Sequence, residues 1–122
     1  MRKVMFITPL ALSVALCLSP ASAQTGGYSA GDLLSPCQEA DNDARWGEAA
    51  ETECEQYIMG FVGALAVTEA GAAAGICPPP SNTADEIRWA FMRWVHASFS
   101  ARKAMPAEQA LLSTLKESFA CN

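Results

Sequence analysis

The sequence contains a single histidine, His96, in 122 residues. This excludes a metal site built from several imidazoles, and it allows a Ser–His–Asp triad only through that one side chain. Basic residues are also scarce, 8 against 13 acidic, so the chain has no positive excess for binding the phosphates of a nucleic acid. Hydrophobic residues make up 51%, which is too apolar for a disordered chain. We therefore expect at most one folded domain and no nucleic-acid partner.

The N-terminal residues have the pattern of a secretion signal. Arg2 and Lys3 precede an apolar stretch, and a small-residue cleavage motif ends at Ala23. This predicts a cleaved signal peptide over residues 1–23, a flexible lead-in over 24–31 and a domain over 32–122, exported to the periplasm. An uncleaved anchor is disfavoured because the apolar stretch is shorter than the ~20 residues of a spanning helix.

The cysteines favour two disulfides. Cleavage of the signal would remove Arg2, Lys3 and Cys17, which leaves a net charge of −7 and four cysteines. A lipoprotein signal using Cys17 is disfavoured because Leu16 stands where a small residue is required. An even number of cysteines in a small exported chain indicates disulfides, and the wide spacing disfavours zinc. The four are Cys37, Cys54, Cys77 and Cys121.

The remaining pattern is helical throughout. We predict helices over residues 32–41, with Asp32 as N-cap, and over 49–74. A third begins with a capping box of Thr83 and Glu86, and a fourth begins with Pro106 at its first position. No segment alternates with period two, so we expect an all-α fold, a small bundle of four to five helices. The inward positions of the third helix are Ile87, Ala90, Phe91, Trp94, Val95 and Ser98.

Topology selects one disulfide pairing among three. Cys54 and Cys77 would lie roughly 30 Å apart along a continuous second helix, too far for a bond. Short connections make successive helices antiparallel, so Cys77 and Cys121 fall at the same end of the bundle. We therefore predict Cys37–Cys54 and Cys77–Cys121. Pairing Cys37 with Cys77 and Cys54 with Cys121 would need a reversed fourth helix.

No catalytic, cofactor-binding or metal site is predicted. His96 has no partner arrangement typical of a catalyst. The acidic residues between Glu39 and Glu55 indicate solvated charge, since the Asp41–Asp43 run lacks the later ligands of a calcium loop. Residues 57–76 carry one charge, Glu69, yet their many alanines and glycines favour a soluble bundle over stable membrane insertion.

Two segments are candidates for a protein interface. One helix face lies off the core stripe and is aromatic and basic, which is typical of an interface; its residues are Arg88, Trp89, Met92, Arg93 and His96. The connection over residues 97–105 is the one basic segment of the mature chain. Its candidate partner-binding residues are Ser98, Ser100, Arg102, Lys103 and Met105.

Three motifs resemble the type VI secretion amidase immunity proteins, the Rap/Tai family. Residues 54–63 read C-E-Q-Y-I-M-G-F-V-G, similar to the family's C-x-x-Y-x-x-G-[FV] segment and the glycine that follows it. Cys77-Pro78-Pro79 resembles its C-x-P element, and Phe119-Ala120-Cys121 resembles its terminal aromatic-x-C. The chain departs from the family pattern around Asp85, between Pro106 and Glu108, and at Ala120.

The resemblance implies a periplasmic, helical, disulfide-bonded inhibitor that is often a homodimer and has no enzymatic activity or cofactor. Its partner would be a peptidoglycan amidase effector, whose active site is occluded by a loop that matches residues 97–105. The resemblance also assigns close helix packing to Tyr57, Gly60, Phe61 and Gly63. An alternative is a small periplasmic acid-stress chaperone, or another helical binding protein of that compartment.

Overall fold

The computed structural model describes residues 27–41 and 47–122, and within them every regular secondary-structure element is a helix. The predicted signal peptide, Asn42, Asp43 and Arg45 lie outside the described residues. The fold class is therefore confirmed, with six helices in the described part. These are α1 (Ala30–Glu39), α2 (Gly47–Val67), α3 (Ala70–Ala73), α4 (Thr83–Ala97), α5 (Phe99–Arg102) and α6 (Ala107–Ser118).

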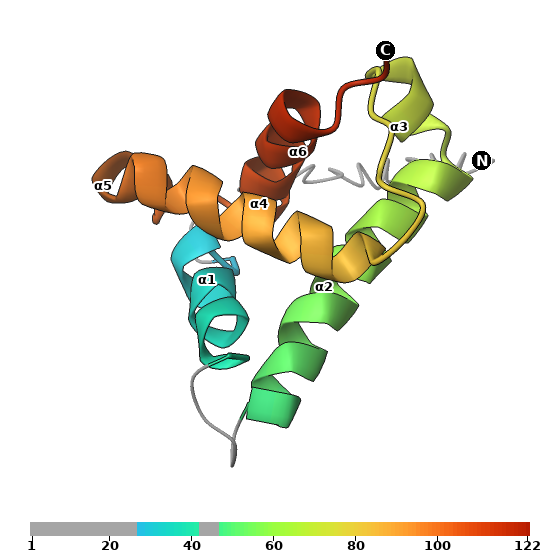
Figure 1. Cartoon of the computed structure of the whole chain (residues 1–122). Coiled ribbons are helices and arrows are strands. Elements are labelled where there is room, and N and C mark those ends of the chain that lie inside the picture. The colour runs from blue at the N-terminus through green and yellow to red at the C-terminus, as the bar shows by residue number, and fades with distance from the viewer. Residues whose placement is uncertain (1–26, 42–46) are drawn as a thin grey trace, which may run out of the picture.

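The helix α4 lies across α2 and α6, and α1 packs against all three (Figure 1). The core forms where their apolar faces meet, because residues three and four apart share one side of a helix. The fully buried side chains include Leu33, Ile58, Ile87, Phe91, Val95, Leu111 and Leu115. Trp94 is half-buried and Ser98 is exposed, since α4 ends at Ala97. No helix in the described ranges has the length and apolar character to cross a membrane.

The start of α1 differs from the prediction. Asp32 was expected to be the N-cap, but Ser29 occupies that position and Asp32 is the third helical residue. The Asp32 amide donates to Ser29 Oγ at 3.1 Å, and the Ser29 amide donates to Asp32 Oδ2 at 2.9 Å. This reciprocal capping box satisfies two backbone donors that the first turn leaves free. Residues 29–31 are thus part of the folded domain and not of a flexible lead-in.

This capping box predicts a pH dependence of stability. Hydrogen bonds from the Ser29 side chain and backbone hold the pKa of Asp32 below its ordinary value. A folded-state pKa below the unfolded one adds stability above about pH 4, and that stability is lost as the pH falls through the folded-state pKa. We expect the wild type to lose stability more steeply below about pH 4 than Asp32→Asn, as measured by urea unfolding across a pH series. A constant difference between the two proteins from about pH 2 to 7 would contradict this.

The second helix is shorter than predicted. A continuous helix over residues 49–74 was expected, but α2 ends at Val67 and Glu69 is left-handed, with φ 57°. The chain then turns back over the end of α2, where Gly71 packs against Leu65. This reversal places Ile76 in the core, with 4% of its surface exposed, whereas a continued helix would carry it away.

The start of α4 also differs from the prediction. Thr83 is the first helical residue and not the N-cap, and its hydroxyl donates to the carbonyl of Pro79 at 2.7 Å. The N-cap is Asn82, which is left-handed at φ 50° and makes no side-chain cap. The expected capping box with Glu86 is therefore wrong, because the Thr83 hydroxyl points back to the proline-rich segment before the helix and not to the Glu86 amide. Pro106 likewise precedes α6 as its N-cap instead of lying inside it.

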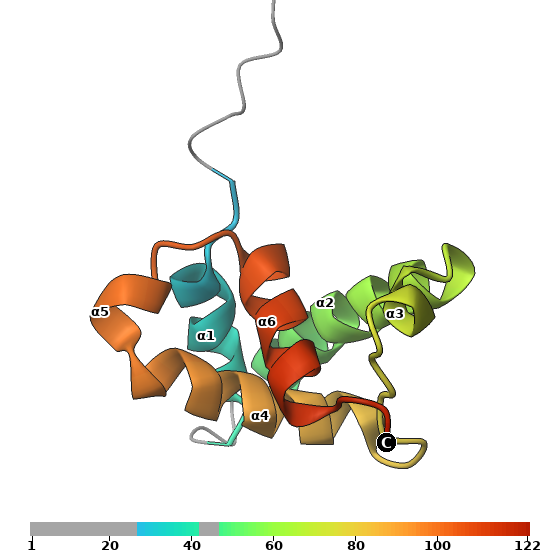
Figure 2. The ribbon, with the colours of Figure 1, turned by 90° about the horizontal axis from the view of Figure 1, so that it is seen from above.

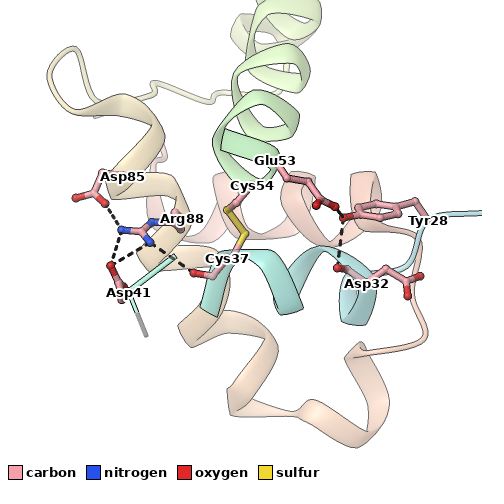
Figure 3. Close-up of a disulfide and its surroundings, with 8 residues drawn as sticks. All are labelled: Tyr28, Asp32, Cys37, Asp41, Glu53, Cys54, Asp85 and Arg88. Carbon is pink, nitrogen blue, oxygen red and sulfur yellow. Dashed lines mark hydrogen bonds and ion pairs between the residues drawn. A yellow bond between two sulfur atoms is a disulfide. The ribbon is translucent and has the colours of Figure 1, made fainter. Parts of the chain in front are cut away.

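Both predicted disulfides are confirmed. Cys37–Cys54 joins α1 to α2, and Cys77–Cys121 joins the segment after α3 to the C-terminus, each with 5.0 Å between Cα atoms. The first bond, drawn in Figure 3, links two cysteines with no exposed surface, whereas the cysteines of the second bond are exposed. Backbone hydrogen bonds flank the second bond, since the Cys77 amide donates to Phe119 and the Cys121 amide to Gly75, both at 2.8 Å. Because Cys37, Cys54, Cys77 and Cys121 all form disulfides, none of them is a thiolate that could bind zinc.

Candidate partner-binding face

The predicted loop over residues 97–105 contains the short helix α5 and is held at its end by α1. The amide of Gly31 donates to the carbonyl of Lys103 at 2.9 Å, and the amide of Ala30 donates to Met105 at 2.7 Å. Figure 2 shows α5 at one edge of the molecule, with α3 and the C-terminus on the opposite side. The segment therefore projects from the fold, and backbone hydrogen bonds to α1 hold its C-terminal end in place.

The five candidate side chains of this segment have different environments. Ser98, Ser100 and Lys103 are exposed, and Met105 is half-buried. The guanidinium of Arg102 lies 3.8 Å from the centre of the Trp94 ring and donates to the Trp94 carbonyl. Arg102 therefore fastens α5 to α4, and the charge that this segment offers to a partner comes from Lys103.

A row of aromatic side chains continues from α5 onto α4. Phe99 is 43% exposed, and its ring stacks on His96 with centroids 6.1 Å apart. Lys103 Nζ lies 5.4 Å from the centre of the same Phe99 ring. The side-chain nitrogen of Gln38, on α1, lies 2.7 Å from His96 Nε2. His96 thus links the projecting segment to the space between α1 and α4.

That space is a hollow of about 370 Å³. We call it the α1–α4 hollow; its lining residues are Gln38, Asp41, Trp89, Met92, Arg93 and His96. Trp89 is 44% exposed and Met92 is buried. The sequence pattern identified the α4 contribution, but not Gln38 and Asp41. Their participation depends on how α1 is placed against α4, which no local signal in the sequence encodes.

One residue of the predicted interface face has a different role. Arg88 was expected to be exposed, but only 5% of its side chain is, because it reaches back toward α1 (Figure 3). Its guanidinium lies 2.7 Å from Asp85 and 3.3 Å from Asp41, and it donates to the Cys37 carbonyl at 3.5 Å. Burial alone would lower the pKa of Arg88, but the hydrogen bond to Asp85 and the attraction of both carboxylates raise it above its ordinary value. Arg88 is therefore a charged clamp between α1 and α4.

A comparison with protein-family models matches residues 29–121 to the Rap1a immunity proteins. The chain belongs to the Rap1a immunity family. The matched range begins at the N-cap of α1 and ends at Cys121, so it includes all six helices and both disulfides. The resemblance to type VI secretion amidase immunity proteins is thereby confirmed. Searches of curated proteins and of solved structures gave no match.

The helix-packing motif of this Rap1a family member divides into two pairs. Tyr57 and Phe61 are half-buried against the core, and the ring of Tyr57 lies 5.2 Å from that of Tyr28. Gly60 and Gly63 are exposed, and a Cβ placed on either would meet no described residue within 4 Å. Within the described part of one copy, therefore, no second helix packs closely against these two glycines.

A second hollow, of about 660 Å³, lies between α1 and α2, and two of the acidic residues noted in the sequence, Glu39 and Glu53, line it. The hydroxyl of Tyr28 donates to Glu53 at 2.9 Å and to the Asp32 carbonyl at 3.3 Å (Figure 3). Burial and then the hydrogen bond to Glu53 raise the pKa of Tyr28, which keeps this hydroxyl protonated. Across residues 27–41 and 47–122, no group of three His, Cys, Asp or Glu side chains is placed to hold a metal ion. In this family member Glu53 therefore holds Tyr28, which precedes α1, against α2.

Proposed function

We propose that this chain is a periplasmic immunity protein that binds a peptidoglycan amidase effector of type VI secretion and occludes its active site. The observation that carries the proposal is the match to the Rap1a immunity family over all six helices. On this proposal the chain is exported by its N-terminal signal, acts as an inhibitor and not as an enzyme, and needs no cofactor. The homodimer implied by the resemblance belongs to the same proposal.

The segment over residues 97–105 is our candidate for the occluding element. It projects at one edge of the molecule (Figure 2), and Ser98, Ser100 and Lys103 are exposed on it. Its backbone is already fixed by α1, and Arg102 fixes it to Trp94. A segment that is ordered before binding loses less conformational entropy in the complex, which favours affinity.

A steric substitution tests this assignment. We expect Ser100→Trp to weaken inhibition of the amidase encoded beside this gene by about tenfold or more, equivalent to about 1.4 kcal/mol, because the indole would collide with the cleft. The measurement is peptidoglycan hydrolysis by the amidase at increasing concentrations of the purified chain. Ser118→Trp is the matched control, since Ser118 is exposed at the end of α6.

Two results would contradict the proposal at different levels. Absence of both binding and inhibition by the wild type would reject an amidase as the partner. Inhibition that Ser100→Trp and Ser118→Trp leave equally intact would reject residues 97–105 as the occluding element while the immunity function stands.

A further inference from the structure

We propose that the α1–α4 hollow receives an apolar side chain of the partner protein, and that Arg93 binds a carboxylate next to that side chain. The inference rests on the proposed function, because it assigns the partner's chemistry at a second point of the same interface. Its evidence is the lining of the hollow, the charges around it and its continuity with α5.

The lining suits an apolar side chain. The indole of Trp89 forms an exposed wall, and Met92 lies beneath with 7% of its surface exposed. Methionine is flexible and polarisable, so it adapts to side chains of different shape. Tryptophan next to a pocket is enriched among the residues that dominate protein–protein affinity. A volume of about 370 Å³ accommodates one large side chain, with room for its flanking backbone.

The charges select an acidic neighbour for that side chain. Among the described residues Arg93 forms no ion pair, whereas Asp41, the one carboxylate of the lining, lies 3.3 Å from Arg88. The cation of Arg93 is thus available at the rim of the hollow, while the nearby carboxylate is already compensated. In a chain with net charge −5, such a site attracts anionic segments, which the acidic rest of the surface repels.

The hollow is continuous with the projecting segment. His96 lines the hollow and stacks on Phe99 of α5, and Lys103 Nζ lies 5.4 Å from the centre of the same Phe99 ring. One partner can therefore contact α5 and the hollow together, with Lys103 adding a second cation to the same face. This continuity favours a protein segment over an isolated small molecule as the occupant.

Peptide titration tests the recognition chemistry without the effector. The probe is an acetylated, amidated pentapeptide, glycine–phenylalanine–aspartate–aspartate–glycine, added at millimolar concentration to the isotope-labelled full chain purified after export. We expect NMR shifts at the Trp89 indole N–H, the Met92 methyl group and the Arg93 amide. A peptide with two lysines in place of the aspartates, and one with serine in place of phenylalanine, should bind more weakly.

Matched variants give the size of the charge effect. Arg93→Gln should weaken binding of the aspartate peptide by about two- to fivefold, the range for an exposed ion pair. Lys116→Gln removes the same charge from the exposed side of α6 and should leave binding unchanged. No shifts, equal shifts with the lysine peptide, or shifts that depend only on protein concentration would overturn the inference, the last by identifying a second copy as the occupant.

The amidase assay separates the two proposals. Trp89→Ala should weaken inhibition while the melting temperature stays close to that of the wild type. Full inhibition by Trp89→Ala would remove the hollow from the interface and leave the proposed function standing. Peptide binding at the hollow in a chain that inhibits no amidase would reject the proposed function alone.

Discussion

Replacing Cys37 and Cys54 together with Ala is expected to lower the free energy of unfolding by about 4 kcal/mol. The bond closes a loop with a sequence separation of 17, for which chain entropy accounts for about 3 kcal/mol. Both cysteines are fully buried between α1 and α2, so the loss of sulfur contacts adds about 1 kcal/mol. Urea unfolding followed by circular dichroism measures the change.

The second disulfide is the natural comparison. Cys77–Cys121 closes a loop with a separation of 44, for which chain entropy alone accounts for about 4 kcal/mol. Its cysteines are exposed, so their replacement by Ala removes little packing. We expect the two double variants to be destabilised by similar amounts. A loss much smaller for the Cys37/Cys54 pair than for the Cys77/Cys121 pair would show that packing around the buried bond contributes nothing.

Replacing Arg88 with Met is expected to lower the free energy of unfolding by about 2–3 kcal/mol. Breaking a fully buried ion pair costs about 3–5 kcal/mol because it leaves a buried charge without its partner. The cost is smaller here because Asp41 and Asp85 are 43% and 48% exposed, so water compensates part of the loss. The Cys37 carbonyl also loses its contact with the guanidinium.

Arg93→Met is the matched control for this substitution. Arg93 is exposed on the same helix and forms no ion pair with the described residues, so its replacement should change stability by less than about 0.5 kcal/mol. Thermal or urea unfolding of the two variants measures the difference. Equal stability of Arg88→Met and Arg93→Met would contradict the role of Arg88 as a clamp between α1 and α4.

Much of this fold follows from local pattern. Apolar residues three and four apart predicted the helical faces on which Ile87, Phe91 and Leu111 are buried, because burial of such a face is what stabilises a short helix. The disulfide pairing followed from the order of the helices, since only two pairs of cysteines fall at common ends. The candidate segment at residues 97–105 was recognisable from its charge and from the family motifs.

The errors share a different physical origin. The predicted N-cap at Asp32 and the predicted capping box at Thr83 each misplaced a helix start, because the N-cap depends on where the preceding chain enters the helix. The break at Glu69 was missed because nothing in an alanine- and glycine-rich stretch forbids a helix. The chain reverses there because Ile76 gains burial in the core.

By itself, the sequence determined the all-α class, the two disulfides and the family, since these depend on residue spacing and on the number and order of cysteines. Tertiary structure alone decided that Arg88 would be a buried clamp and that Trp89 would border a hollow, although both lie on one turn of α4. Their difference arises from α1, which places Asp41 and the Cys37 carbonyl beside one side chain and leaves the other open. A helix pattern specifies which side chains share a face, and only the packing of a second helix specifies what each of them meets.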